Sequence, residues 1–227
     1  MRRVNQKNIT VVGANSNTAK FIKKRLQAQS TGNTWRFISH GDVEASKKLL
    51  RQSDVVLNLS VHPEIMRVGT LNDETNLDMR LARIIESSDA HYIMASTRKV
   101  YGNHPANPEI TEESPIAPEC GYGEAKVEIE RQLAGILPAS RLSIVRFTNV
   151  AGFNDFTQVG LVGTVFNRFA HGQPVKMTLD PDCARDFLPQ HKFSEIMVAF
   201  TENPQAGTFN LGSGVGLPLR NIMETWA

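Results

Sequence analysis

The chain of 227 residues has only two cysteines, no long apolar run and no block of like charges. Cys120 and Cys183 are too few and too far apart for a disulfide framework or a zinc site, so we expect two free thiols and no bound metal. No window approaches the roughly 18 apolar residues of a membrane-spanning helix, and the charged N-terminus lacks the apolar stretch of a signal peptide. These absences predict a cytoplasmic protein that does not enter a membrane.

The charges are nearly balanced and evenly scattered. The 25 Lys and Arg residues against 23 Asp and Glu residues give a net charge of +2, with no basic patch that would indicate nucleic acid binding. Internal repeats and low-complexity tracts are also missing. With 41% hydrophobic residues, the chain is long enough for one substantial core and a small additional lobe.

Short apolar runs alternate with amphipathic segments along most of the chain. The runs are rich in β-branched residues, as in strands buried on both faces, and the segments between them have helical spacing. We expect strands at 9–13, 35–39, 54–60, 91–96 and 143–147, and helices at 18–29, 42–50, 76–85 and 122–133. This order predicts an α/β fold with a doubly wound parallel sheet of the Rossmann type.

The alternation of expected strands and helices is interrupted at two places. Four prolines indicate a loop over 103–119, and after Gly152 the elements become irregular, with helices expected at 164–171 and 193–201 and a strand at 208–211. We therefore divide the chain into an α/β domain at 1–150 and a smaller lobe at 151–227. The lobe is expected to lie over the strand ends, with some of its elements returning to the main sheet.

The turn after the first expected strand reads Gly13-Ala-Asn-Ser16-Asn-Thr-Ala19. In dinucleotide-binding folds this turn is glycine-rich, because backbone N–H groups and a helix N-terminus meet the pyrophosphate there. Here Ser16 and Ala19 replace the second and third glycines. The side chains of Asn15, Ser16, Asn17 and Thr18 are able to hydrogen-bond a phosphate instead; the alternative is a simple polar helix cap.

Tyr122 and Lys126 lie four residues apart on an expected helix and so share one face. A neighbouring ammonium stabilises a phenolate, and a nearby hydroxyl such as that of Thr97 then shares a proton with it and with a substrate oxygen. On its own the Tyr-x-x-x-Lys spacing is common on helix surfaces, so its context decides its meaning.

That context resembles the extended short-chain dehydrogenase/reductases, the NAD-dependent epimerase/dehydratase family that acts on nucleotide sugars. The resemblance runs from about residue 9 to residue 225. Its most specific blocks are Ser96-Thr97-Arg-Lys-Val-Tyr-Gly102 and Tyr122-Gly-Glu-Ala-Lys126. The other blocks, in order, are Gly13-x-x-Ser-x-x-Ala, Asp42-Val43, Asp54-Val-Val-Leu-Asn-Leu-Ser60, Asn76-Leu, Arg146-Phe-Thr-Asn149-Val-Ala-Gly152, Arg185-Asp-Phe and Asn210-Leu-Gly-Ser-Gly214.

The resemblance implies a role for individual residues. Tyr122 would be the acid/base, Lys126 its partner and a ligand of the nicotinamide ribose, and Thr97 the hydroxyl partner, with Ser96 facing the core. Asn149 and Arg185 would bind the nucleotide diphosphate of the substrate; the alternative for Arg185 is a surface ion pair with Asp182 or Asp186. The cofactor would be held by Gly13, Asn15, Ser16, Asn17, Thr18, Asp42, Val43, Leu59, Ser60, Asn76 and Lys126.

Several positions depart from the family pattern. His40-Gly41 stands where an acidic residue usually binds the adenosine ribose, and no arginine marks a 2′-phosphate site, so the cofactor is NAD or NADP. Leu-Pro189-Gln-His191-Lys192 replaces the usual Ile-His-Val-Asp-Asp. The chain ends at Trp226-Ala227, where the family continues, so it is either part of a longer protein or a member with an incomplete substrate lobe.

Arg98-Lys99 stands where the 4,6-dehydratases carry Asp-Glu after the threonine, which argues against dehydration. We therefore expect an oxidoreductase or epimerase that transfers hydride at a carbon of a nucleotide sugar. The alternative is a non-catalytic Rossmann protein, a cofactor sensor or scaffold with a degenerate glycine loop. The family resemblance also implies a possible homodimer, paired through helices that include 76–85 and 123–133.

Overall fold

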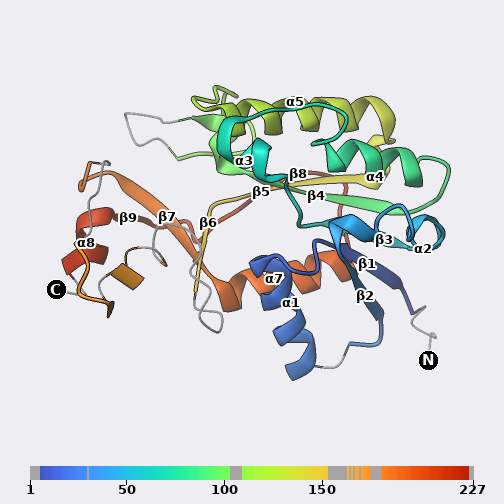
Figure 1. Cartoon of the computed structure of the whole chain (residues 1–227), viewed down its shortest axis with the longest axis horizontal. Coiled ribbons are helices and arrows are strands. Elements are labelled where there is room, and N and C mark those ends of the chain that lie inside the picture. The colour runs from blue at the N-terminus through green and yellow to red at the C-terminus, as the bar shows by residue number, and fades with distance from the viewer. Residues whose placement is uncertain are drawn as a thin grey trace.

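The computed structural model describes residues 6–29, 31–102, 109–152, 163, 165, 167–168, 170–174 and 180–224. Its centre is a six-stranded parallel sheet with the strand order β2-β1-β3-β4-β5-β8 (Figure 1). The strands are β1 (Asn8–Val12), β2 (Thr34–Ile38), β3 (Val55–Asn58), β4 (His91–Thr97), β5 (Leu142–Phe147) and β8 (Gly207–Leu211). The prediction of a doubly wound parallel sheet is confirmed.

Helices cover both faces of this sheet. One face carries α3 (Pro63–Val68), α4 (Leu77–Ile85) and α5 (Gly121–Ile136), and the other carries α1 (Asn17–Ala28) and α7 (Gln190–Glu202) (Figure 1). The side chains of β4 alternate accordingly: Tyr92 and Met94 join the core under α4 and α5, whereas Ile93 joins the core under α1 and α7. The sheet therefore separates two hydrophobic cores, as expected for strands buried on both faces.

The chain after β5 forms a small second sheet and also adds a helix and a strand to the main sheet. A small sheet of β6 (Asn149–Ala151), β7 (Ala184–Pro189) and β9 (Gly216–Pro218), followed by α8 (Leu219–Glu224), lies beside the main sheet (Figure 1). In contrast, α7 packs beside α1, and β8 extends the main sheet next to β5. Elements therefore do return to the main sheet, while the domain boundary near residue 150 stays a prediction.

The expected helix at 42–50 is wrong as a single element. The chain forms the 3-10 helix η1 (His40–Asp42), then turns, and then the short helix α2 (Lys47–Arg51). The Ser39 hydroxyl accepts a hydrogen bond from the Gly41 N–H at 3.4 Å, which favours a tight turn at the start of the segment.

Helix α3 and the 3-10 helices η2 (Arg98–Tyr101) and η3 (Ala139–Arg141) are also absent from the expected elements. Helix α3 begins with Pro63 at its first position and ends at Gly69, whose φ is +76°. The expected loop at 103–119 has no helix or strand over 109–119, and residues 103–108 lie outside the described residues. The expected helix at 164–171 also lies partly outside them, with Val165, Asn167, Arg168 and Ala170 helical. Within the described ranges, no helix has the length and apolar character to cross a membrane.

Candidate active site

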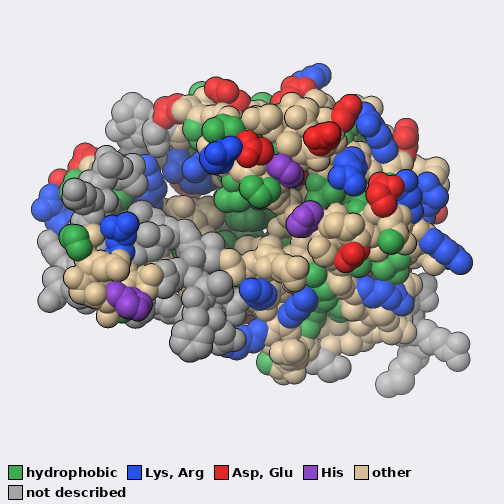
Figure 2. Space-filling model, viewed as in Figure 1, with side chains coloured by type: hydrophobic (Ala, Val, Ile, Leu, Met, Phe, Trp, Pro, Cys, Tyr) green, Lys and Arg blue, Asp and Glu red, His purple; other side chains and the backbone are tan. Residues whose placement is uncertain are grey.

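A cavity of about 510 Å³ opens where strands of the main sheet end and the small sheet begins. It corresponds to the hollow that the space-filling view shows between the α3–α5 layer and the α1 side (Figure 2). Ten of the predicted site residues line it: Gly13, Asn15, Ser16, Asn17, Thr18, Leu59, Ser60, Tyr122, Lys126 and Asn149. The cavity thus brings together the expected cofactor turn, the expected acid/base pair and one expected substrate residue.

The turn at 13–18 fits tightly against the end of β3. Gly13 has a φ of +94°, and a Cβ placed on it would lie 2.9 Å from the Ser60 nitrogen, so only glycine suits the position. Ser16 is the N-cap of α1, with its hydroxyl accepting a hydrogen bond from the Ala19 N–H at 3.1 Å. The polar cap considered for this turn is therefore present.

Asn17 leaves this turn with an unused acceptor. Its Oδ1 atom is buried and has no hydrogen-bond partner among the described residues, although Asn17 lines the cavity. A buried polar atom without a partner is costly, and a bound donor such as a ribose hydroxyl would satisfy it. The N–H groups of Asn17 and Thr18 at the start of α1 also have no partner in the part of the chain that the structure describes, so the turn fits a dinucleotide.

Tyr122 and Lys126 occupy the first two turns of α5 and face the same cavity. A Cβ on Gly123 would lie 2.8 Å from the Lys99 carbonyl oxygen, so this glycine lets α5 approach η2 closely. As a result, the Lys99 ammonium lies 5.6 Å from the centre of the Tyr122 ring. A cationic side chain, that of Lys99, therefore lies beside the candidate acid/base, and Lys126 follows Tyr122 by four residues on α5.

Lys126 is almost completely buried, with 2% of its surface exposed. Its ammonium donates a hydrogen bond to the Ala95 carbonyl at 2.9 Å and lies 3.7 Å from Oδ2 of Asp78. Oδ1 of Asp78 accepts hydrogen bonds from the amide of Asn58 and the hydroxyl of Tyr92, each at 2.7 Å. Burial, reinforced by the charge of Asp78, raises the pKa of Tyr92 well above its ordinary value.

Asp78 and Asn58 were not among the predicted site residues. A signal for Asp78 was available, because it shares one face of α4 with Leu81, Ala82 and Ile85, which are three, four and seven residues further on. A charged residue on such an apolar face needs a buried partner. Asn58 gives no comparable signal, since it stands at the end of an otherwise apolar strand.

Ser96 and Thr97 have different hydrogen-bond partners. Ser96 donates a hydrogen bond to the buried carboxylate of Glu130 on α5. Thr97 has 8% of its surface exposed, and its hydroxyl accepts a hydrogen bond from the Lys99 N–H at 3.2 Å. Thr97 does not itself line the cavity, so its part in catalysis stays a prediction.

Four other predicted residues also lie outside the cavity lining. Asp42 is exposed, and Val43 is fully buried in the core under α4 and α5. Asn76 caps α4 by accepting from the Met79 N–H at 3.1 Å, and its amide donates to Gln132 of α5 at 2.9 Å. In their place Ser39 and His40, at the end of β2, line the cavity.

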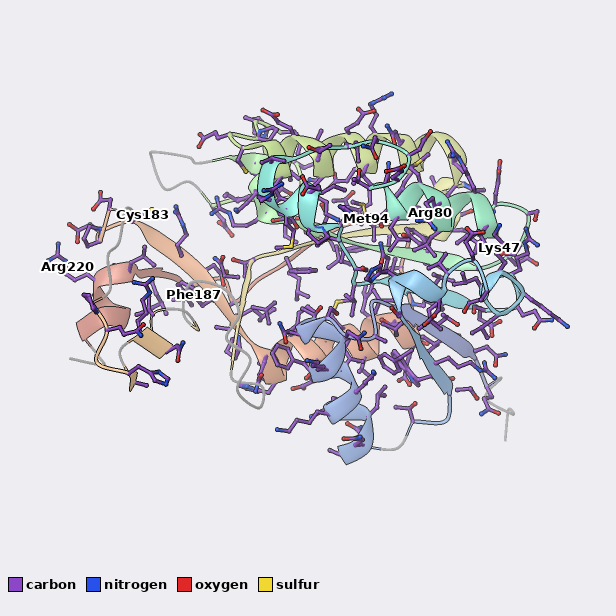
Figure 3. The ribbon with its side chains drawn as sticks, viewed as in Figure 1. Lys47, Arg80, Met94, Cys183, Phe187 and Arg220 are labelled. Atoms are coloured by element: carbon purple, nitrogen blue, oxygen red, sulfur yellow. The ribbon has the colours of Figure 1, made fainter. Side chains whose placement is uncertain are left out.

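Arg185, the last of the predicted residues outside the cavity lining, lies on β7. Its guanidinium donates to the sulfur of Cys183 at 2.7 Å and to the Ala184 carbonyl at 3.2 Å. Asp182 pairs with Arg220, and Asp186 accepts hydrogen bonds from Ser213, so within the described ranges neither forms the ion pair considered for Arg185. Cys183 and Arg220 lie on the small lobe, away from Met94 in the main sheet (Figure 3).

Residues 1–212 match the family described as the NAD dependent epimerase/dehydratase family. The chain belongs to this family. The family's NAD dependence confirms the prediction of NAD or NADP as cofactor. A UDP-glucose 4-epimerase from Halalkalibacterium halodurans is 26% identical over 166 residues, which are 63% of this chain and 49% of that relative. The chain thus spans about half the length of this curated relative.

Solved structures of family enzymes share the fold. A dTDP-glucose 4,6-dehydratase from Bacillus anthracis, in complex with NAD, has a TM-score of 0.78 at 17% identity, over 97% of this chain and 79% of the other. A dTDP-4-dehydrorhamnose reductase from Clostridium acetobutylicum has a TM-score of 0.77 at 20% identity, over 96% and 79%. Because an epimerase, a dehydratase and a reductase are all similar to this chain, the fold does not distinguish their reactions.

Proposed function

We propose that the chain carries the catalytic core of an NAD(P)-dependent oxidoreductase or epimerase that acts on a nucleotide sugar. The observation that carries this proposal is the single cavity lined by the glycine turn, by Tyr122 and Lys126, and by Asn149. Its volume of about 510 Å³ lies within the range of small-molecule and cofactor sites. When bound, the nicotinamide would supply or accept a hydride at a sugar carbon.

The protein's own residues would then handle the proton. Tyr122 would donate a proton to the sugar oxygen in reduction and remove it in oxidation. Lys126, fixed on the Ala95 carbonyl, would stabilise the phenolate form of Tyr122 and bind the nicotinamide ribose. Thr97 would hydrogen-bond the same sugar oxygen, and Asn149 and Arg185 would bind the nucleotide diphosphate, with the guanidinium matching the phosphate charge.

The surroundings of Tyr122 favour reduction or epimerisation over dehydration. Elimination of water from the sugar requires an additional acid and base beside the acid/base tyrosine. In this chain Arg98 and Lys99 follow Thr97, and the Lys99 ammonium lies 5.6 Å from the Tyr122 ring. Neither side chain is a base at neutral pH. Hydride transfer at a sugar carbon needs only the proton of Tyr122.

The alternative is a non-catalytic protein that binds the dinucleotide as a sensor. The Ser16 cap is the feature that would favour it, because the hydroxyl is engaged within its own helix. Against it stands the complete pair of Tyr122 and Lys126 at the cavity wall. A sensor has no use for an acid/base there, so the catalytic function is the better supported one.

Replacement of Tyr122 tests this function. We expect Tyr122→Phe to lower turnover of a nucleotide sugar by about 100-fold or more, because the proton donor is lost, while NADH binding is retained. Turnover is measured from NADH absorbance with a panel of UDP- and dTDP-hexoses and their 4-keto forms, and binding by NADH fluorescence. Tyr101→Phe is the matched control, since Tyr101 is buried outside the cavity, and it should keep turnover. Native turnover by Tyr122→Phe would contradict the proposal.

A further inference from the structure

Asp78 is a buried carboxylate outside the cavity lining, with 3% of its surface exposed. It lies in the first turn of α4, directly under α5, and its two carboxylate oxygens have different partners. Oδ1 is held by Asn58 and Tyr92 at 2.7 Å each, which fixes the carboxylate to β3 and β4. Oδ2 faces the Lys126 ammonium.

The contact between Asp78 and Lys126 is one of charge. The distance of 3.7 Å from Oδ2 to the ammonium nitrogen is longer than a hydrogen bond, so the attraction does not use up one of the three N–H donors of the lysine. One donor is bound to the Ala95 carbonyl. The other two have no partner among the described residues and stay available for ligands in the cavity. A buried ammonium also needs a compensating charge, and Asp78 is the carboxylate that supplies it within the described ranges.

The polar cluster of Asp78, Asn58, Tyr92 and Lys126 also contacts a second part of the cavity wall. Oδ1 of Asn58 accepts a hydrogen bond from the Ser60 N–H at 2.9 Å, and the amide of Asn58 donates to Asp78. Ser60 and Lys126 both line the cavity, whereas Asn58 and Asp78 lie behind it. The polar cluster thus joins the glycine-turn side of the cavity to the acid/base side.

From this geometry we propose that Asp78 is a positioning residue for the reaction. By its charge it holds the Lys126 ammonium against the Ala95 carbonyl, so that the lysine faces Tyr122 and the cofactor in a fixed geometry. The proposal rests on the function proposed above for Tyr122 and Lys126. An asparagine at position 78 would keep the shape and the contacts of Oδ1 but would remove the attraction for the ammonium.

The test compares Asp78→Asn with Ile85→Val, a fully buried residue on the same face of α4 whose side chain is purely apolar. We expect Asp78→Asn to lower kcat by about tenfold or more while KM for the nucleotide sugar changes by less than about twofold, because the lysine is displaced and the sugar contacts are intact. A crystal structure of Asp78→Asn without ligands should show Lys126 Nζ detached from the Ala95 carbonyl. Ile85→Val should lower the thermal midpoint and leave kcat unchanged.

Two results would each overturn the proposal. One is a lysine that keeps its hydrogen bond to Ala95 in Asp78→Asn, and the other is a displaced lysine with native kcat. If the native protein neither binds NADH nor converts a nucleotide sugar, the proposed function fails, while the crystal structure still decides whether Asp78 holds Lys126.

Discussion

Gly13 is a residue of the cavity wall at which side chains other than glycine do not fit. Its φ of +94° is strained for other residues, and an added Cβ would lie 2.9 Å from the Ser60 nitrogen, which is closer than carbon and nitrogen approach. We expect Gly13→Ala to destabilise the fold by about 1 kcal/mol or more and to weaken NADH binding about tenfold or more. Fluorescence titration and urea denaturation measure the two effects.

Gly135→Ala is the control for this substitution. Gly135 lies near the end of α5, with nothing within 4 Å of an added Cβ, so alanine should stabilise the helix by roughly 0.5–1 kcal/mol and leave NADH binding unchanged. If Gly13→Ala bound NADH as tightly as the native chain, the turn would not be the cofactor site.

At this scale, residue type predicted only part of the site. Gly13, Tyr122 and Lys126 were predictable because a turn or a helix spacing fixes their chemistry within a few residues. The partnership of Asp78 with Lys126 was not, because α4 and α5 come together only through the sheet. The 3-10 helix η2, which follows Thr97, was likewise not predictable, because so short a helix gives no periodic signal.

Helices and strands were predictable where a hydrophobic pattern extends over several consecutive residues. All six strands of the main sheet and helices α1, α4, α5 and α7 lie close to the expected ranges, since apolar runs and amphipathic faces mark them. Strands β6, β7 and β9 were missed. Strands β6 and β9 have three residues each, none of them buried, and β7 has one buried residue among six, so none of the three has an apolar pattern. Helix α3 was also missed, because a proline at its start and a glycine at its end mark it and an apolar face does not.

Helix α5 is joined to three strands by a buried ion pair. Glu130 accepts a hydrogen bond from Arg146 of β5 at 2.6 Å and another from Ser96 of β4. Arg146 donates to the Tyr101 hydroxyl at 2.9 Å, and that hydroxyl donates to Asn210 of β8 at 2.8 Å. Burial by itself would lower the pKa of Arg146, but the hydrogen bonds to Glu130 and Tyr101 outweigh burial and raise it.

Glu130→Gln would therefore leave a buried guanidinium without its counter-charge. We expect it to lower the free energy of unfolding by about 3 kcal/mol, measured by urea denaturation. Glu128→Gln is the matched control: it removes an exposed partner of Arg131, whose hydrogen bonds lower the pKa of Glu128 to about 2, and it should change stability little. Equal effects of the two substitutions would show that burial of the Glu130 pair does not matter.

At the scale of the whole molecule, the positions of the exposed hydrophobic side chains indicate what kind of contact a homodimer would use. The large hydrophobic side chains that are exposed in the described ranges are Met66, Val68, Ile116, Ile196, Val215 and Leu217, and none of them lies on α4 or α5. A homodimer paired through α4 and α5 would therefore rest on polar contacts. An interface of that kind is sensitive to salt, unlike one formed by an apolar core.

The amino-terminal edge of the sheet should make stability depend on pH. Half-buried His91, at the start of β4, contacts the Ser143 hydroxyl of β5 at 2.7 Å, and Ser143 donates to the Gln205 carbonyl at 2.6 Å. Because Ser143 is the donor to Gln205, it accepts from Nε2–H of His91. Burial, followed by the charges of Arg141 and Lys7, lowers the pKa of His91 below its ordinary 6.5.

A lowered histidine pKa means that the unfolded chain takes up a proton at a pH where the folded chain does not. The contribution of His91 to stability is therefore complete above about pH 6.5 and is lost as the pH falls towards the lowered pKa. We expect the thermal midpoint to fall by a few degrees between about pH 7.5 and pH 5.5, and His91→Gln to reduce that fall. His191→Gln, at an exposed position on α7, should leave the slope unchanged. If the native protein and His91→Gln showed the same slope, groups other than the half-buried imidazole of His91 would cause the pH dependence.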